Sequence, residues 1–396
     1  MSFVRQEELL RWLKPEAPSD YERRCAEQLE AIDYDVYRHK LQLILSEALD
    51  IFVNCGISDV AMAGDVGIFL FTPEGDLVAC SVGSYLHIVS SVLPVKYIMR
   101  KLRHLPGMAI REGDFYFCND PQFGMVHNAD QIVLMPIFHS GTLVAWTGAI
   151  AHTGETGATE PGGMPVRARS RFDEGMKMPP FRIGERYQLR PDLLQMMENY
   201  VSRSPRKFMI ELRARLSACD RVRIRIQELV SLKGADFLAG LLRKCLDEAE
   251  ASARQRIRGW NDGTYRAVTF TDSIGLEEGL QRVSLTLVKS EDTLLLDFSG
   301  TSPEHEGSYH AFPHAVAAHA AIYLFSWPFC DLPRSSATLA PCEFVFAPGT
   351  ALSPRPEAST SNSVMIGSAV MSLLPNCFAK MMFDSPQREF ISAAMG

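Results

Sequence analysis

The sequence predicts an α+β protein with more than one subdomain, in which helices pack against mixed, mostly antiparallel sheets. First, 396 residues are more than one hydrophobic core usually accommodates. Second, the 46% hydrophobic and 22% charged residues are typical of an ordinary globular chain. Third, short apolar segments and long helical stretches occur without the regular strand–helix–strand order of parallel sheets.

The chain divides into four expected regions. They are an N-terminal extension (1–32), an α+β region that would carry a metal site (33–200), a helical segment (201–262) and a C-terminal α+β region (263–396). A helix is expected from about residue 33, with Gly56 as its terminator. The apolar residues that recur in it at helical spacing are Val36, Leu41, Ile44, Leu45, Leu49 and Phe52.

The rest of the second region is predicted to be rich in strands. Residues 66–80 indicate two strands around the turn "PEGD", because Pro and Gly suit a tight reversal. Residues 87–102 return to helical periodicity. Three more short apolar segments are expected to be strands: "DFYFCND", "QIVLMPIF" and "TLVAWTGAIA". The stretch 159–190 is rich in Pro, Gly and Arg, and its length favours a functional role or packing against a partner.

The second half begins with long helices. One is expected after Ser204 as N-cap, with Pro205 in the first turn, and another covers roughly 235–257. A hairpin is then predicted, and the residues on one of its faces are Val283, Leu285, Leu287, Leu294, Leu296 and Phe298. The stretch 306–332 carries few charges and includes an apolar helix, so we expect part of it to be buried against partner subunits.

Several function classes are disfavoured. The formal charge of −7 is mild and spread along the chain, which argues against a nucleic-acid partner. No uncharged apolar stretch of about 18 residues is present, and the N-terminus lacks the apolar run of a signal peptide. The nine cysteines form no CxxC pair, which indicates free thiols and a cytoplasmic location. The phosphate-loop, GxGxxG and GxSxG patterns are absent.

One constellation suggests metal chemistry. His127 and Asp130 stand three residues apart just before an apolar run, and His152 follows the next apolar run. Two antiparallel strands joined at "HSGT" would return the chain to its starting point and bring the three side chains together. Imidazole and carboxylate ligands suit zinc, manganese or iron, and three ligands with an open position are typical of a catalytic site. His87 could contribute to the same cavity.

Four blocks of the sequence resemble the hydantoinase B family. They are "GDFYFCNDPQFGMVHNAD", "LVAWTGAIAHTGETGATEPGGMP", "FDEGMKMPPFRIGE" and "LDFSGTSPEHEGS". The family includes N-methylhydantoinase B, the C-terminal half of 5-oxoprolinase, caprolactamase, and the metal-binding subunits of acetone and acetophenone carboxylases, which the chain resembles more than the hydantoinases. The resemblance implies His127, Asp130 and His152 as metal ligands, with Asp65 as a candidate fourth.

The resemblance also implies a division of labour between subunits. A hydantoinase A-like partner would bind ATP and Mg²⁺, and a small third subunit could complete the complex. Glu155 or Asp120 could act as general base or orient a ligand, although Asp120 could equally form a simple turn. The chain departs from the family at "AHTGETG", where relatives usually have "AHHADIGG", so that Glu155 is the nearby carboxylate.

Three functions therefore remain open from the sequence. The first is the metal-binding subunit of an ATP-dependent ketone carboxylase that uses bicarbonate. The second is a subunit of an ATP-dependent hydrolase of a cyclic amide such as a lactam or hydantoin. The third is a degenerate family member with a scaffolding role.

Overall fold

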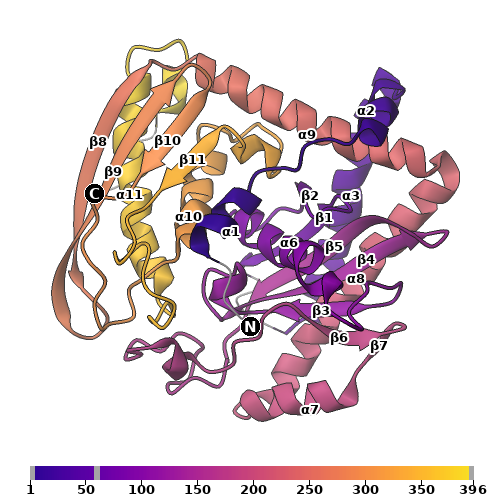
Figure 1. The fold of residues 1–396 in the computed structure, drawn as a ribbon, viewed down its shortest axis with the longest axis horizontal. Coiled ribbons are helices and arrows are strands. Elements are labelled where there is room, and N and C mark those ends of the chain that lie inside the picture. Colours follow the sequence, from indigo (N-terminus) through magenta and orange to yellow (C-terminus); the bar gives the residue numbers. More distant parts are fainter. Residues whose placement is uncertain (1–4, 58–62, 392–396) are drawn as a thin grey trace.

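The computed structural model describes residues 5–57 and 63–391, which form two sheets with helices around and between them (Figure 1). The first sheet has seven strands in the order β2-β1-β5-β4-β3-β6-β7, and every neighbouring pair is antiparallel. These strands are β1 (Val66–Phe71), β2 (Leu77–Cys80), β3 (Phe115–Cys118), β4 (Asp130–His139), β5 (Thr142–His152), β6 (Phe181–Glu185) and β7 (Gln188–Leu189). The antiparallel α+β expectation is confirmed.

The β4–β5 hairpin forms the centre of this sheet. Its tight turn lies at Ser140 and Gly141, whose φ angles of 50° and 79° are typical of a two-residue hairpin turn. Pairing continues along the hairpin until Asp130 lies opposite His152. The predicted reversal at "HSGT" is therefore confirmed.

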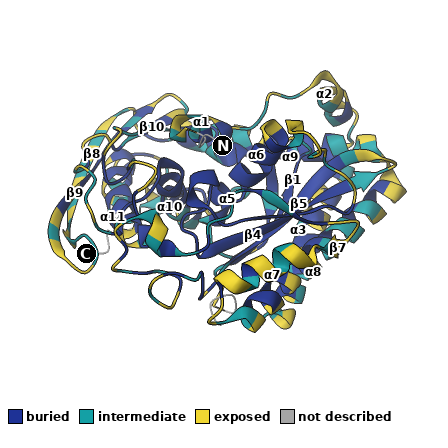
Figure 2. Cartoon of the chain, turned by 60° about the horizontal axis from the view of Figure 1, so that its bottom comes forward, coloured by how far each residue is buried: buried dark blue, intermediate teal, exposed yellow. Residues whose placement is uncertain are grey.

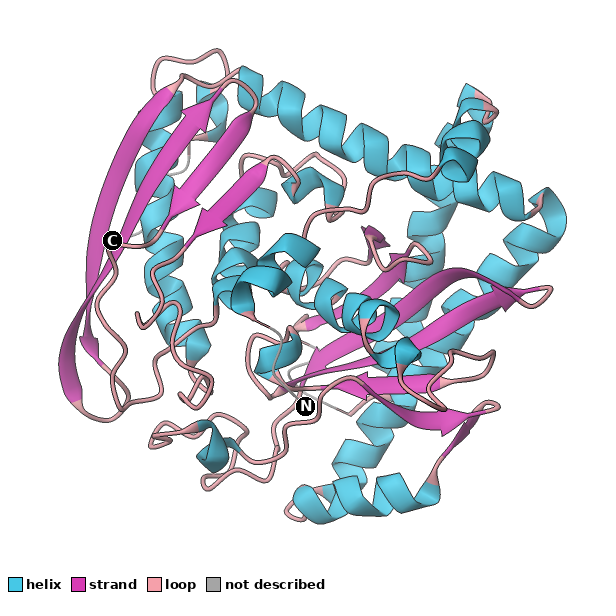
Figure 3. Ribbon diagram, viewed as in Figure 1, coloured by secondary structure: helices cyan, strands magenta, loops and turns pink. Residues whose placement is uncertain are grey.

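Both faces of the first sheet are buried. Along β4, Ile132 and Leu134 point into one core, whereas Val133 and Met135 point into the other. This explains why the strands are continuously apolar rather than alternating. Helices α3 (Ala31–Cys55) and α8 (Pro205–Lys233) cover the second of these faces (Figure 3).

Among the helices that contribute to the core on the opposite face are three that lie near the sheet. They are α5 (His87–Ser90), α6 (Val92–Arg100) and α10 (Pro313–Ser326). The helix α10 is almost entirely buried and lies in the interior of the molecule (Figure 2). The expectation that the apolar stretch 306–332 marks a partner surface is therefore not supported for α10, because the chain itself covers this helix.

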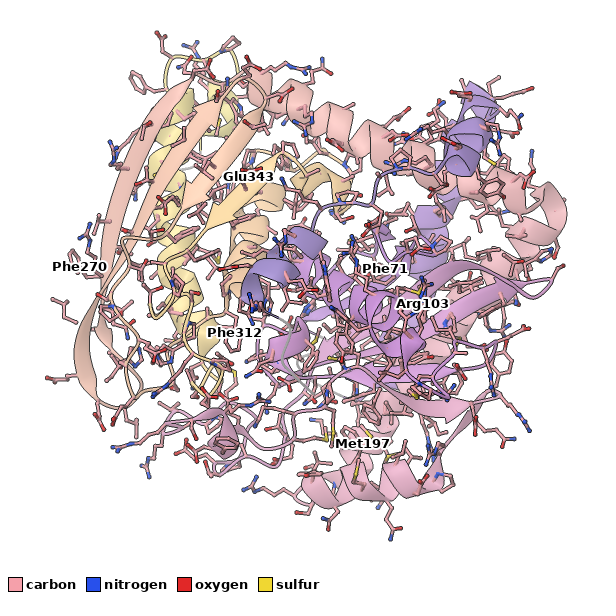
Figure 4. All side chains as sticks on the ribbon, in the orientation of Figure 1. Phe71, Arg103, Met197, Phe270, Phe312 and Glu343 are labelled. Atoms are coloured by element: carbon pink, nitrogen blue, oxygen red, sulfur yellow. The ribbon has the colours of Figure 1, made fainter. Side chains whose placement is uncertain are left out.

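The second sheet has the strand order β11-β10-β9-β8. Its strands are β8 (Gly263–Ser273), β9 (Glu278–Ser290), β10 (Thr293–Asp297) and β11 (Cys342–Val345). Only β10 and β11 pair in parallel within this sheet. The six residues predicted for one face of the hairpin are all buried, which confirms that prediction. The other face of this sheet is open, and the exposed side chain of Phe270 on β8 points outward from the sheet (Figure 4).

The helix α11 (Ser363–Met382) packs against α10, β8 and β9. By length and composition it could span a membrane, with a mean hydropathy of 1.3, and it is the one such helix among the described residues. Its contacts give a simpler reason for its apolar character, because its inner face belongs to the core beneath the second sheet.

A long helix connects the two halves. After α8, Gly234 adopts a φ of 94° and the chain reverses into α9 (Ala235–Arg258), which runs toward the second sheet (Figure 1). The remaining helices are α1 (Gln6–Trp12), α2 (Asp20–Glu27) and α7 (Pro191–Tyr200). The four region boundaries expected from the sequence stay a prediction.

One of the apolar residues at helical spacing is exposed. On α3, Leu41, Ile44, Leu45 and Phe52 are buried, but Val36 is 55% exposed. Val36 lies one helical turn after the exposed Ile32, so it belongs to the solvent-facing side of the helix.

Candidate metal centre

Three ligand atoms converge at one end of the first sheet. His127 Nε2 lies 3.3 Å from Asp130 Oδ1 and 3.1 Å from His152 Nδ1. The third pair, His152 Nδ1 and Asp130 Oδ1, is 3.4 Å apart. Among the described residues, these three side chains form the cluster that could hold a metal ion.

The strand order explains why they meet. Asp130 begins β4 and His152 ends β5, and the two residues are paired directly across the hairpin. His127 lies in the connection before β4, where its carbonyl accepts a hydrogen bond from the Asp130 N–H at 3.2 Å. Asp65 precedes β1 on the other side of β5, and its carbonyl accepts from the His152 N–H at 3.3 Å. Three neighbouring strands thus supply the site.

The residues fit a divalent transition metal. Ligands bound at about 2.1 Å lie about 3.0 to 3.4 Å apart in octahedral or tetrahedral geometry, and the observed distances between the three atoms span this range. Two imidazoles and one carboxylate occur together as ligands in catalytic sites of such metals. In addition, Asp130 Oδ2 is buried and has no hydrogen-bond partner among the described residues, which is unusual for a carboxylate that has no further ligand.

Asp65 lies at the more exposed side of the cluster. Its Oδ2 is 4.0 Å from His152 Nδ1, and its side chain is 33% exposed, compared with 2% for Asp130. Asp65 Oδ1 also lies 3.1 Å from Nε2 of His87, whose side chain is fully buried. His87 therefore adjoins the cluster through Asp65.

The orientation of His127 is fixed by its second ring nitrogen. Nδ1 lies 3.1 Å from the carbonyl oxygen of Ser361, which can accept only if Nδ1 carries the proton. In the neutral ring, Nε2 then presents its lone pair to Asp130 and His152. A histidine that donates to a carbonyl in this way is the usual arrangement of a metal-binding imidazole.

The electrostatics of the cluster favour a cation. Burial opposes charge on His127, but the Asp130 carboxylate beside it raises the pKa of His127 to about 9. Burial likewise opposes charge on Asp130, yet the charge and hydrogen bond of His127 hold the pKa of Asp130 well below its usual value. Both shifts favour positive charge beside the Asp130 carboxylate, and a metal ion at this place would compete with the proton of His127.

The two candidate bases have partners outside the cluster. Asp120 accepts from the Gln122 N–H at 2.9 Å and from Arg171 Nη2 at 2.9 Å, so it forms the turn that is its alternative role. Glu155 accepts from Arg203 Nη1 at 3.0 Å and from the Gly157 N–H at 2.5 Å. Within the described residues, neither carboxylate contacts the three ligands.

Other residues around the site could not be read from the sequence. His319 on α10 lies close enough that the charges of His127 and Asp130 act on it, although burial is the main reason why its pKa falls to about 4. Ser361 contributes only its main-chain carbonyl, which any residue type could supply. Both lie far along the chain from the ligands, and no local spacing points to them.

Comparison with known proteins identifies the family of the chain. The family model described as hydantoinase B/oxoprolinase matches residues 30–390. The acetophenone carboxylase delta subunit of Aromatoleum aromaticum is 44% identical over 100% of this chain and 58% of its own length. The chain thus spans less than two thirds of this relative.

Solved structures show the same fold. A nucleotide-free structure of acetone carboxylase superimposes with a TM-score of 0.87 at 22% identity, over 94% of this chain and 50% of that chain. The ATP-dependent caprolactamase of Pseudomonas jessenii gives a TM-score of 0.79 at 19% identity, over 91% of this chain and 61% of that chain. By the extent of the family match and its identity to a curated relative, the chain belongs to the hydantoinase B/oxoprolinase family.

Proposed function

We propose that this chain is the metal-binding part of an ATP-dependent ketone carboxylase complex. The observation that carries the proposal is the convergence of His127 Nε2, Asp130 Oδ1 and His152 Nδ1. Support for the reaction class comes from the 44% identity, over the whole chain, to an acetophenone carboxylase subunit.

Manganese, zinc or iron bound there would supply Lewis-acid polarisation of a ketone oxygen, which favours the enolate that attacks carbon dioxide. The chain's own residues bind and orient. His127 and Asp130 are buried, whereas Asp65 is partly exposed, so the ketone would approach from the Asp65 side. Asp65 is the candidate fourth ligand.

Proton transfer from the ketone needs a base near the site. Glu155 and Asp120 remain the candidates, and Glu155 is the nearer in sequence, three residues after His152. To reach the substrate, Glu155 would have to break its contact with Arg203, whose side chain is 43% exposed. Asp120 is held more firmly, because its partner Arg171 is largely buried.

ATP chemistry is assigned to partners. The sequence carries neither of the two common phosphate-binding patterns, so we place ATP and Mg²⁺ on a hydantoinase A-like subunit, with a small third subunit as a further component. Bicarbonate would be the source of the carboxyl group. The free state of all nine cysteines, which lie within the described residues, supports a cytoplasmic location for the complex.

A cyclic-amide hydrolase is the second candidate. The fold similarity to an ATP-dependent caprolactamase favours it, and the same three ligands would suit the oxygen of a lactam or hydantoin. The ligand types do not separate the two reactions, so the substrate must be tested directly.

The test combines the full complex, ATP and two sets of substrates. We expect incorporation of labelled bicarbonate into acetone or acetophenone and no ring opening of caprolactam or hydantoin. Ring opening without bicarbonate fixation would replace the proposal by the hydrolase. A complex in which the chain binds no metal and in which His127→Ala leaves activity unchanged would instead indicate the scaffolding role.

A further inference from the structure

A buried carboxylate outside the ligand cluster organises the segment that holds His127. Glu174 is 1% exposed and ends a short helical turn that begins at Arg171. Its Oε1 accepts three hydrogen bonds: from Ser359 Oγ at 2.8 Å, from the Thr360 N–H at 2.6 Å and from the Ser361 N–H at 2.8 Å. Three donors on one oxygen fix the path of residues 359–361.

That segment leads directly to the metal centre. The carbonyl of Ser361 is the acceptor for His127 Nδ1, so two consecutive hydrogen bonds connect Glu174 to a ligand. Ser361 is also held from its other side, because its Oγ donates to the Pro165 carbonyl at 2.9 Å. The carbonyl that orients the imidazole therefore has little freedom of its own.

The main chain of Glu174 supports the opposite flank of the ligand. Its carbonyl accepts from the side-chain amide of Asn128, the residue after His127, and from Thr156 Oγ1 at 2.9 Å. One residue thus restrains both the ring of His127 and the backbone beside it.

Burial of a charged carboxylate at this place costs free energy, so it needs compensating donors. Burial raises the pKa of Glu174, while nearby Lys177 and the three donors act to lower it. An apolar side chain would avoid the cost of burial but would leave two main-chain N–H groups without an acceptor. The donors that compensate the carboxylate belong to the segment next to His127.

We propose that Glu174 is a positioning residue of the metal centre, whose carboxylate fixes residues 359–361 so that the Ser361 carbonyl holds His127 with Nε2 toward the metal. This inference rests on the metal site proposed above. It assigns no contact between Glu174 and the metal or the substrate.

The test measures metal affinity in the full-length chain. Zn²⁺ affinity is obtained by competition with a chelator, and Co²⁺ absorption reports the ligand geometry. We expect Glu174→Ala to weaken Zn²⁺ binding by about 10- to 100-fold and to change the Co²⁺ spectrum. Glu174→Gln should stay within a few-fold of the wild type, because its amide oxygen can accept the same main-chain donors.

Two controls and a substitute variant make the result specific. Glu357→Ala removes an exposed carboxylate from the same connection and should leave affinity unchanged. Leu296→Ala lowers stability in the distant second sheet and should not alter the Co²⁺ spectrum. If Glu174→Ala does not fold, Glu174→Asp replaces it, since it keeps the charge but withdraws the oxygens from residues 359–361.

The outcomes separate the two proposals. A wild-type chain that binds neither Zn²⁺ nor Co²⁺ overturns the metal site and with it this inference. A wild type that binds, together with a Glu174→Ala or Glu174→Asp variant of unchanged affinity and spectrum, overturns the role of Glu174 alone. Equal spectral change in Leu296→Ala would also overturn it, because the effect would then follow from lower stability.

Discussion

Asp130 and His152 face each other directly across β4 and β5, and Oδ1 of the first lies 3.4 Å from Nδ1 of the second. Directly paired residues in an antiparallel sheet project to the same face, so the strand register itself places the two candidate ligands together. The register shift of this hairpin lies near its turn, between Ile137 and Phe138, at the end away from the site.

Removal of a ligand should abolish tight metal binding. For His127→Ala and His152→Ala we expect Zn²⁺ affinity to fall by more than about 100-fold, beyond the usual effect of an outer-shell residue. Metal content after purification, measured by plasma emission spectrometry, checks this. His139→Ala is the matched control, since His139 ends β4 at the other end of the hairpin and should keep the metal. Equal metal content in all three variants would exclude this site.

Acid should destabilise the protein partly through His310. Its Nδ1 lies 2.9 Å from the Ser359 carbonyl and its Nε2 accepts from the His305 N–H, so the ring must be neutral. Burial, aided by the stacked His305, lowers the pKa of His310 from 6.5 to about 3. As the pH falls from about 6.5 toward 3, the unfolded chain therefore binds a proton at His310 that the folded chain does not. Protonation thus favours the unfolded state, and the free energy of unfolding falls over this range.

Urea unfolding in the presence of a chelator, at pH 7.5 and at pH 5, measures this effect. Between pH 7.5 and pH 5, the free energy of unfolding should fall further in the wild type than in His310→Gln. The difference should be up to about 1.4 kcal/mol for each pH unit below 6.5. His104→Gln, in which an exposed histidine is replaced, should keep the wild-type slope. Parallel slopes for wild type and His310→Gln would contradict the assignment.

A glycine permits the close approach of α10 and α11. A Cβ atom added at Gly367 would lie 2.0 Å from Nε2 of His319, so the ring or the helix would have to move. We expect Gly367→Ala to destabilise the fold by about 1 to 3 kcal/mol, as overpacking usually does. Ser368→Ala, at the next and exposed position, should change stability by less than about 0.5 kcal/mol. Thermal unfolding of the two variants distinguishes local crowding from helix propensity.

Thiol reactivity should follow burial. Cys55 and Cys330 are exposed, whereas the other seven cysteines are buried. Burial raises the pKa of the Cys118 thiol well above its ordinary value, which makes a nucleophilic role there unfavourable. A colorimetric thiol reagent should therefore modify two cysteines quickly in the native chain and nine in denaturant. Fast modification of a third in native protein would point to a reactive thiol.

Much of the fold followed from local patterns. Apolar residues alternate with polar ones at Val283, Leu285 and Leu287, and Leu294 and Leu296 continue this pattern after the turn. All five are buried on the inner face of the hairpin. The β4–β5 reversal could be predicted because Ser140 and Gly141 suit a tight turn between apolar runs. Val36 shares the helical spacing of the buried residues but is exposed, because helical spacing identifies an apolar stripe and not how much of its width is buried.

The surroundings of the metal cluster were beyond sequence reasoning for another reason. Glu174 and Ser361 are 187 residues apart, and the contact between them depends on how the second half of the chain packs on the first. What covers α10 also depends on how distant parts of the chain pack together. Its apolar sequence indicated only that something covers it, and the covering elements turned out to be parts of the same chain.

The long separation between His127 and Ser361 also bears on biosynthesis. The acceptor for the His127 ring is made 234 residues after the ring itself. A nascent chain on the ribosome can form the β4–β5 hairpin early, but it presents an unrestrained imidazole until residue 361 has emerged and packed. If the cluster binds a metal as proposed, tight capture is therefore expected only after residue 361 has packed, as a late step of maturation.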